Sequence, residues 1–273
     1  MHDPTKVVLG ATQSSAKDIQ CFNSDPATFL AGLVVSLGSD SGLSLLKSAG
    51  YKVGVSLGKS LSDHKKTSVC VAGLSVPILA HLKRASAIFT VTDYTHLLSG
   101  GGADTVAIAS VTFTAQSGAV TSGQATFRAA TDNATTAASL AAQINAHATT
   151  AALVYAVASG AAVTVYSKVD GVGSTGTGND IIAAYNNLHD QPGIVVTGSS
   201  GGKLAGGSNT ITDIDYVAVG AKAYVNDTTG KLDVAMTGFS TITDAIYIST
   251  EKTGIAEDNS EVACALVDMT GGL

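Results

Sequence analysis

One serine of the chain lies in a pattern that is known for nucleophilic catalysis. Gly54, Ser56 and Gly58 match G-x-S-x-G, in which a strained turn between a strand and a helix exposes the serine hydroxyl of a hydrolase. The same chemistry requires a downstream acid and histidine on an α/β fold. The residues after Gly58 are typical of a turn rather than of an amphipathic helix. We therefore interpret Ser56 as a strand residue, and a serine hydrolase that uses Ser56 is a distant alternative.

Two glycine patterns resemble phosphate-binding loops. The segment Gly58-Lys59-Ser60 has the ending of a P-loop, but only three residues separate Gly54 from Gly58 where that loop needs four. The segment 171–176, GVGSTG, matches the dinucleotide pattern G-x-G-x-x-G, which requires a βαβ unit and a ribose-binding acid about 20 residues further on. Because neither context is present, both segments are interpreted as loops, and no cofactor is expected.

The residue types that bind metals or transfer protons are dispersed. Asp213 and Asp215 could share one side of a strand, but two carboxylates make a weak cation site, and solvation of a strand edge is the preferred interpretation. No two histidines are four residues apart, and none forms a convincing pair with an acid or cysteine beside it in the sequence. The histidines are His2, His64, His81, His96, His147 and His189. We therefore predict no catalytic, cofactor-binding or metal-binding residues and no enzymatic activity.

Three cysteines, Cys21, Cys70 and Cys264, lie far apart and have no metal-ligand spacing. This usage is typical of reduced thiols in a protein made in a cytosol. The N-terminal stretch has no apolar run of signal-peptide length, and no window approaches the 18 apolar residues of a membrane span. We expect synthesis in the cytoplasm and no membrane partner.

The charge content is low for a globular protein. Only 13% of the 273 residues are charged, against about 25% in ordinary domains. Ser, Thr and Gly must then solvate much of the surface, or partners must cover it. The net charge is −6 and the basic residues are scattered, so the sequence has no basic face for nucleic acid.

Two glycine clusters, 100–102 and 198–207, divide the chain, because glycine-rich stretches mark loops and linkers. The stretch between them is rich in Ala, Thr and Val and has only Arg128 and Lys168 as fixed cations. We predict an inserted domain at 103–197 in a host domain made of 1–99 and 208–273, with the clusters as hinges. One continuous domain with long glycine-rich turns is the alternative.

The host domain is predicted to be an antiparallel β-sandwich or barrel, because short Val- and Leu-rich segments alternate with turn residues. The expected strands are 29–37, 43–46, 53–57, 68–71, 74–79, 216–219, 221–225, 232–236, 245–248 and 262–267. The segment 226–230, NDTTG, is a good hairpin loop, because Asn, Asp and Gly tolerate positive φ. The fold class is therefore mainly β.

The insert is predicted to be a small α+β unit with one helix on a sheet. Strands are expected at 105–115, 124–129, 153–158 and 163–168, the last two as a hairpin around Ser159 and Gly160. A helix is expected at 134–148, with Asp132 as its N-cap. Its apolar face follows helical spacing. That face consists of Ala137, Leu140, Ala141, Ile144 and Ala148.

Three segments together resemble structural proteins of tailed bacteriophages. The segment 50–79, GYKVGVSLGKSLSDHKKTSVCVAGLSVPIL, is similar to the characteristic stretch of small head decoration (cement) proteins. The segment 221–231, AKAYVNDTTGK, is similar to the hairpin near the end of such proteins. Residues 127–168 resemble an Ala/Thr-rich module that recurs as an insert in phage structural proteins.

The resemblance implies a virion protein that binds the outer surface of the assembled capsid, usually as a homotrimer. Its partners would be the major capsid protein and further copies of itself, and it would stabilise the shell by bridging capsid subunits. A tail-tube, baseplate or fibre protein is the alternative. The insert could be an adhesion module or a spacer. The segment up to Ala11 could be a capsid-binding arm or a frayed terminus.

Overall fold

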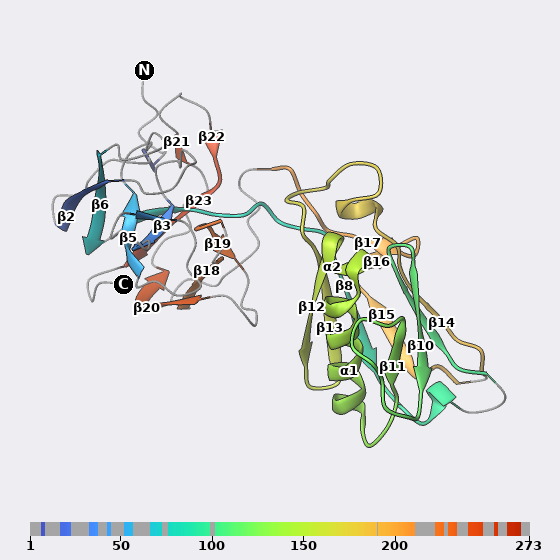
Figure 1. The fold of residues 1–273 in the computed structure, drawn as a ribbon. Coiled ribbons are helices and arrows are strands. Elements are labelled where there is room, and N and C mark those ends of the chain that lie inside the picture. The colour runs from blue at the N-terminus through green and yellow to red at the C-terminus, as the bar shows by residue number, and fades with distance from the viewer. Residues whose placement is uncertain are drawn as a thin grey trace. The chain divides into compact units, whose positions relative to one another are not determined.

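The computed structural model of the chain describes residues 7–8, 17–22, 33–37, 43–44, 52–56, 66–72, 76–98, 102–189, 191–210, 222–226, 229–233, 240–247, 254–255 and 261–268. The chain forms two compact units (Figure 1). The host unit comprises Met1–Leu82 and Thr210–Leu273, and the insert unit comprises Lys83–Asn209. Each unit is described separately below.

Two five-stranded antiparallel sheets form most of the described part of the host unit. One five-stranded sheet has the order β19-β18-β20-β23-β7, and a second has the order β2-β6-β5-β3-β4. The first contains β7 (Val76–Leu79), β18 (Lys222–Val225), β19 (Leu232–Asp233), β20 (Ser240–Tyr247) and β23 (Cys264–Asp268). The second contains β2 (Lys17–Phe22), β3 (Val34–Leu37), β4 (Leu43–Ser44), β5 (Lys52–Ser56) and β6 (Lys66–Ala72). All pairings in both sheets are antiparallel, which confirms the predicted mainly β class.

A small third sheet has the order β1-β21-β22. Its strands are β1 (Val7–Val8), β21 (Gly254–Ile255) and β22 (Glu261–Val262). Val7 and Val8 pair in parallel with Gly254 and Ile255. Part of the segment up to Ala11 is thus a strand of the host unit.

The predicted hairpin loop at 226–230 is present. The Gly230 amide donates to Asn226 O, the Asn226 amide donates to Lys231 O, and the Thr229 amide donates to Asn226 Oδ1. Gly230 has a φ of 70°, which is the left-handed conformation that favours glycine here. The predicted strands on either side of the loop correspond to β18 and β19. The strand expected at 216–219 lies outside the described residues.

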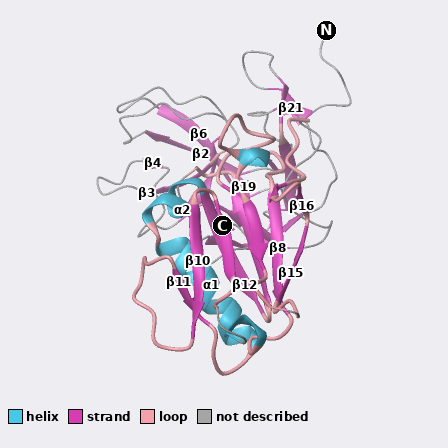
Figure 2. Cartoon of the chain, turned by 90° about the vertical axis from the view of Figure 1, so that its right-hand side faces the viewer, coloured by secondary structure: helices cyan, strands magenta, loops and turns pink. Residues whose placement is uncertain are grey.

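The insert unit consists of two four-stranded sheets and a helix around one core (Figure 2). The first, called here the β8 sheet, has the order β12-β13-β8-β15; the second, the β9 sheet, has the order β11-β10-β9-β14. The β8 sheet contains β8 (Ser86–Val91), β12 (Val154–Ser159), β13 (Ala162–Ser167) and β15 (Ile194–Thr197). The β9 sheet contains β9 (Thr105–Ile108), β10 (Val111–Gln116), β11 (Thr126–Arg128) and β14 (Ala183–Asn186). The inner faces of both sheets contribute to one hydrophobic cluster, which includes Phe89, Phe113 and Phe127.

The boundaries of the insert differ from the predicted 103–197, because the structure assigns the whole of Lys83–Asn209 to this unit. Strand β8 lies before the first glycine cluster, yet it is the central strand between β13 and β15. The second cluster is not simply a hinge either. It contains the hairpin strands β16 (Ser199–Ser200) and β17 (Lys203–Leu204), and Leu204 is buried in the core. The two glycine clusters therefore lie inside the insert unit and do not mark its ends.

The two ends of the insert lie next to each other. The Ser208 amide donates to Lys83 O at 3.0 Å, and Ser86 forms an antiparallel bridge with Ala205. The chain therefore enters and leaves the unit at one place, as an inserted domain must.

Helix α1 (Asn133–Ala146) confirms the predicted helix, although it ends two residues earlier than expected. Asp132 is its N-cap, and Ala137, Leu140, Ala141 and Ile144 are buried as the spacing predicted, whereas Ala148 is exposed. The expected extension to residue 148 is wrong: His147 is extended, and a second helix, α2 (Ala148–Leu153), follows. The break is stabilised by the buried Thr150, whose hydroxyl donates to Ile144 O at 2.6 Å. The single strand expected at 105–115 is also two strands, β9 and β10, which turn at Ala109 with a φ of 54°.

Side chains of α1 bind the free edges of both sheets. The Asn145 side chain pairs with both the N–H and the C=O of Ala156 in β12, each at 2.8 Å. The Ser139 hydroxyl accepts from the Arg128 amide of β11 at 2.8 Å. Edge strands normally expose unpaired backbone groups, and here helix side chains satisfy three of them, the N–H and C=O of Ala156 and the N–H of Arg128. Helix α1 thus closes the gap between β11 and β12 (Figures 1 and 2).

Asn145→Ala tests this closure. The substitution leaves the N–H and C=O of Ala156 without their side-chain partners, so we expect a loss of about 1–3 kcal/mol in the unfolding free energy of the insert. Urea denaturation followed by circular dichroism measures the loss. Ala142→Gln, at an exposed position of the same helix, is the matched control and should change the free energy by less than about 0.5 kcal/mol. Equal effects of the two variants would contradict the role of Asn145.

Candidate functional site

Ser56 is held as a structural residue. It is the last residue of β5 and is fully buried. Its Oγ donates to Leu33 O and accepts from the Leu33 amide, both at 3.2 Å, and its own amide donates to Leu33 O at 2.9 Å. A hydrolase nucleophile must instead be exposed to substrate on a sharp turn. This geometry supports the interpretation of Ser56 as a strand residue.

The segment 171–176 is a compact loop, as predicted, and not a dinucleotide site. Gly171, Gly173 and Gly176 all have positive φ, and a single 3₁₀ turn (Gly178–Asp180) follows where a cofactor site needs a long helix. A Cβ on Gly173 would lie only 2.7 Å from Gly178 Cα. The glycines therefore serve the close approach of the loop to itself.

The remaining sequence candidates contribute no ion site among the described residues. Asp213, Asp215, Lys59, Ser60, His2 and His64 lie outside the described part of the chain. Within that part, no group of three or more His, Cys, Asp or Glu side chains is placed to hold a metal ion.

Three of the four described histidines have an aspartate neighbour, and in two cases the aspartate comes from a distant part of the chain. His81 Nε2 lies 3.6 Å from Asp233 Oδ2, His96 Nε2 lies 3.5 Å from Asp93 Oδ2, and His189 Nδ1 lies 2.8 Å from Asp104 Oδ1. Tertiary contacts therefore supply acidic neighbours that the sequence did not indicate. Two of these pairs join residues more than 80 positions apart, so only the fold brings them together.

The most buried of these pairs belongs to a polar cluster inside the insert, formed by Asp104, Tyr185 and His189. Asp104 is fully buried just before β9; its Oδ1 accepts from the Leu188 amide at 2.9 Å, and its Oδ2 accepts from the Tyr185 hydroxyl. His189 Nδ1 approaches the same carboxylate off the direction of a hydrogen bond. Burial, together with the hydrogen bond to Asp104, raises the pKa of Tyr185 above its usual value. The tyrosine thus stays protonated and donates to Asp104.

This cluster fastens a loop rather than forming a reaction centre. The Tyr185 hydroxyl also accepts from the Gly193 amide at 2.9 Å, so both ends of the segment between β14 and β15 are bound to the cluster. Asp104 and His189 are both more than nine-tenths buried, and a substrate could not reach them without the loop opening. We assign the cluster a structural role.

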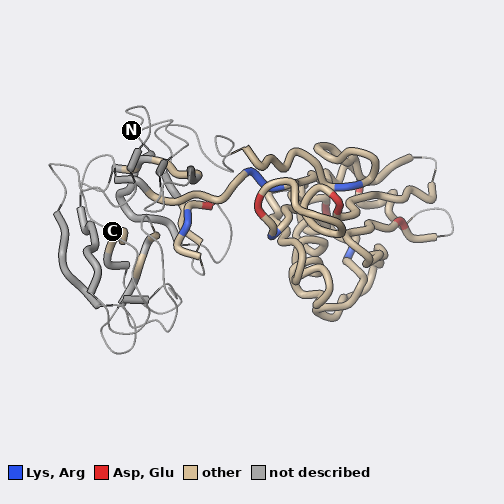
Figure 3. The backbone as a smooth tube through the Cα atoms, turned by 90° about the horizontal axis from the view of Figure 1, so that it is seen from above, with Lys and Arg blue, Asp and Glu red and all other residues tan. Residues whose placement is uncertain are grey.

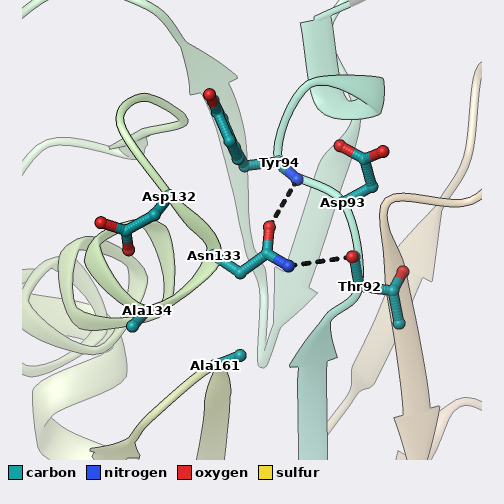
Figure 4. A pocket seen from close by; sticks show the side chains of 7 residues that line it. All are labelled: Thr92, Asp93, Tyr94, Asp132, Asn133, Ala134 and Ala161. Carbon is teal, nitrogen blue, oxygen red and sulfur yellow. Dashed lines mark hydrogen bonds between the residues drawn. The ribbon is translucent and has the colours of Figure 1, made fainter.

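An open recess lies where α1 begins beside the end of β8 (Figure 4). Its volume is about 620 Å³. It is lined by Thr92, Asp93, Tyr94, Asp132, Asn133, Ala134 and Ala161. The Asn133 side chain spans the recess wall: its Oδ1 accepts from the Tyr94 amide and its Nδ2 donates to Thr92 O, both at 2.9 Å. These two bonds attach the start of the helix to the end of β8.

The carboxylates of the recess are also engaged in local bonds. Asp132 Oδ1 accepts from the Thr135 amide and Oδ2 from the Thr135 hydroxyl, which lowers the pKa of Asp132. Asp93 Oδ1 accepts from the hydroxyl and the amide of Thr95, which lowers the pKa of Asp93. Both groups remain ionised at neutral pH, and the lining contains no nucleophile with an adjacent base. Among the polar groups of the recess, Asn133 and Asp132 hold the start of α1 in place.

Acid should weaken the cap of α1. A carboxyl group whose pKa is lowered by folding contributes stability above its unfolded pKa, about 3.9, and loses it as the pH falls through the folded value. Asp132→Asn removes this titration. We expect the variant to melt a few degrees lower than the unmodified chain at pH 6, with the difference shrinking below about pH 4. Melting temperatures between pH 6 and pH 3 measure it; a constant difference would contradict the assignment.

Charged residues are sparse throughout the insert (Figure 3). Lys83–Asn209 contains five Lys or Arg and six Asp, so no face of it carries a strong field. The basic ones are Lys83, Arg84, Arg128, Lys168 and Lys203. No helix in the described residues has the length and apolar character needed to cross a bilayer.

Comparison with known proteins leaves the family open. No family model matches the chain, and no curated protein matches it. One solved structure is similar, a chain described as Mycobacterium phage Patience, with 13% identity and a TM-score of 0.36. The alignment covers 94% of this chain and 99% of that chain. A TM-score of this size does not establish a common fold.

Proposed function

We propose that the chain is a structural protein of the bacteriophage virion that attaches to the outer surface of the assembled head. The proposal rests first on the resemblance of segments 50–79 and 221–231 to small head decoration proteins. Both segments contain host strands: β5, β6 and β7 in the first and β18 in the second. The presence of these strands agrees with that resemblance.

The observation that carries the proposal is the organisation of the chain as an antiparallel host unit with a self-contained insert. The insert has its own core. Its two ends are joined by a hydrogen bond from the Ser208 amide to Lys83 O, with 3.0 Å between the nitrogen and the oxygen. Such an insertion can be displayed without disturbing the unit that holds it. This arrangement suits a protein that attaches by one unit and presents the other.

The proposed mechanism is mechanical. The host unit would bind neighbouring major-capsid subunits and further copies of itself, as a trimer, and would add buried interface to the shell. Stable interfaces of this kind bury more than about 2,000 Å². Because many copies would bind one particle, modest single contacts would give lasting occupancy.

A binding experiment tests the proposal. The purified full chain is mixed with expanded, DNA-free heads of the phage that encodes it and centrifuged through a sucrose cushion. We expect saturable co-sedimentation at a fixed ratio of chain to capsid subunit, and a trimer in sedimentation equilibrium of the free chain. Unexpanded proheads are the control and should bind less. Failure to bind expanded heads, or assembly into rings or tubes by the free chain, would favour a tail component instead.

A further inference from the structure

The outer face of the β8 sheet is an exposed surface without charge. The register of the sheet places every second residue of β12, β13, β8 and β15 on this face, beginning at Tyr155, Ala162, Ser86 and Val195. None of the four strands contains Asp, Glu, Lys or Arg. We call this surface the β8 face.

Apolar side chains on the β8 face are open to solvent. Ile88 in its central strand is 37% exposed and Val195 in its edge strand is 44% exposed. The outer face of the β9 sheet differs, since it carries the charged and exposed Arg128. Solvent-facing sheet surfaces are ordinarily polar and charged. An uncharged face on one sheet of the same unit therefore points to a bound partner.

An aromatic pair forms one end of the β8 face. Tyr155 and Tyr166 are directly opposite in the register of β12 and β13, and their rings stack at 5.2 Å with an interplanar angle of 25°. Arg84 Nη1 donates to the Tyr155 hydroxyl at 2.7 Å, and Arg84 Nε donates to Asp170 at 3.2 Å. Because Arg84 is almost fully buried, it holds the Tyr155 ring in one orientation. Because the side chain is already ordered, less conformational entropy is lost when a ligand binds.

The size of the β8 face limits its partner. Four strands about 4.8 Å apart, with three outward residues about 7 Å apart on a strand, cover about 400 Å². A stable protein–protein interface needs about 800 Å² from each partner. The face is thus too small to hold a second copy of the chain by itself, but it is large enough for several sugar rings.

The chemistry of the β8 face also selects its partner. Its strands carry no cation, and the adjacent Arg84 is buried and paired with Asp170, so the face has no free positive charge to attract the phosphates of nucleic acid or of anionic lipids. Between the apolar residues stand the hydroxyls of Ser86, Thr90 and Thr164, each able to donate and accept hydrogen bonds. A neutral sugar offers the matching groups, since its hydroxyls exchange hydrogen bonds and its C–H faces pack on tyrosine rings.

We propose that the β8 face is a binding site for neutral oligosaccharides. The stacked pair Tyr155–Tyr166 would pack against a sugar ring, and the Ser and Thr hydroxyls would bind the neighbouring rings along the strands. The site is independent of the proposed attachment to capsids. Its test uses the full chain free in solution, so failure of either proposal leaves the other standing.

Calorimetric titration of the full chain tests the site with three neutral probes: cellohexaose, maltohexaose and hexa-N-acetylchitohexaose. We expect at least one to bind with a Kd between about 0.1 and 5 mM. Ile88→Lys should weaken that binding at least tenfold, and Tyr166→Ser at least fivefold. Thr112→Lys, at an exposed position on the β9 sheet, is the matched control and should stay within twofold. Circular dichroism of each variant checks that it is folded.

Three results would overturn the proposal. The first is that none of the three neutral probes binds the folded chain. The second is that Ile88→Lys and Thr112→Lys weaken binding equally, which would place the sugar elsewhere. The third is that the native chain is an oligomer that Ile88→Lys dissociates, which would make the β8 face an interface between copies. A charged probe, hexagalacturonic acid, should bind no more tightly than the neutral probe.

Discussion

A fragment spanning residues 83–209 should fold cooperatively on its own, whereas a fragment spanning 103–197 should not. The longer fragment contains both sheets, α1 and the whole hydrophobic cluster. The shorter one lacks β8, which pairs with β13 on one side and β15 on the other. It would also lose the fully buried Phe89 and the core residue Leu204.

The free energy lost in the shorter fragment is comparable to the total stability of a domain. Removing one buried Phe side chain costs about 3–5 kcal/mol, and a whole domain is stable by only about 5–15 kcal/mol. Losing a central strand, with its backbone hydrogen bonds on two sides, should therefore unfold the shorter fragment. The longer fragment should show a single sigmoidal melt by circular dichroism. A cooperative melt of the 103–197 fragment would contradict the placement of β8 in this unit.

Removing the carboxylate of Asp104 should have the largest effect of any single polar substitution in the insert. In Asp104→Ala the Tyr185 hydroxyl, the Leu188 amide and the buried His189 all lose their shared partner. Leaving a buried donor without its acceptor costs about 1–3 kcal/mol, and two donors lose their acceptor here, so the substitution should cost about 2–6 kcal/mol. We expect that loss in the unfolding free energy of the insert, measured by urea denaturation.

Two further variants separate charge from shape at this cluster. Asp104→Asn keeps the volume and one acceptor, so its loss should lie between that of Asp104→Ala and zero. Tyr185→Phe removes the hydroxyl that joins Asp104 to the Gly193 amide and should cost about 1–3 kcal/mol. Hydrogen exchange should show faster opening of the segment 186–193 in both variants. A stability loss below about 1 kcal/mol in Asp104→Ala would refute the fastening role.

Local features of the fold were predictable because they depend on residues close together in the chain. The apolar spacing of Ala137, Leu140, Ala141 and Ile144, after the N-cap Asp132, predicted α1. The residues Asn226 to Gly230 predicted the hairpin loop between β18 and β19, since their backbone preferences alone favour that turn. The alternation in 153–158 and 163–168 likewise predicted the hairpin of β12 and β13.

The domain edges were not predictable in the same way. Glycine clusters at 100–102 and 198–207 looked like hinges, because glycine permits turns wherever it occurs. Whether such a turn lies inside a domain or between two depends on which strands pair across it. The pairing of β8 with β13 joins residues about 75 positions apart, and no local pattern near residue 86 indicates it.

The amino-acid sequence by itself determined the mainly β class, the position of α1, the hairpin turns and the scarcity of charge, all of which follow from composition and short-range periodicity. Only the tertiary structure decided that Asp104 meets His189 and Tyr185, that Arg84 holds Tyr155, and that Tyr155 and Tyr166 stack on an uncharged sheet face. The physical reason is that sheet register and helix docking join residues from distant strands. The chemistry of a surface depends on those neighbours, whereas a local pattern depends only on the residues beside it.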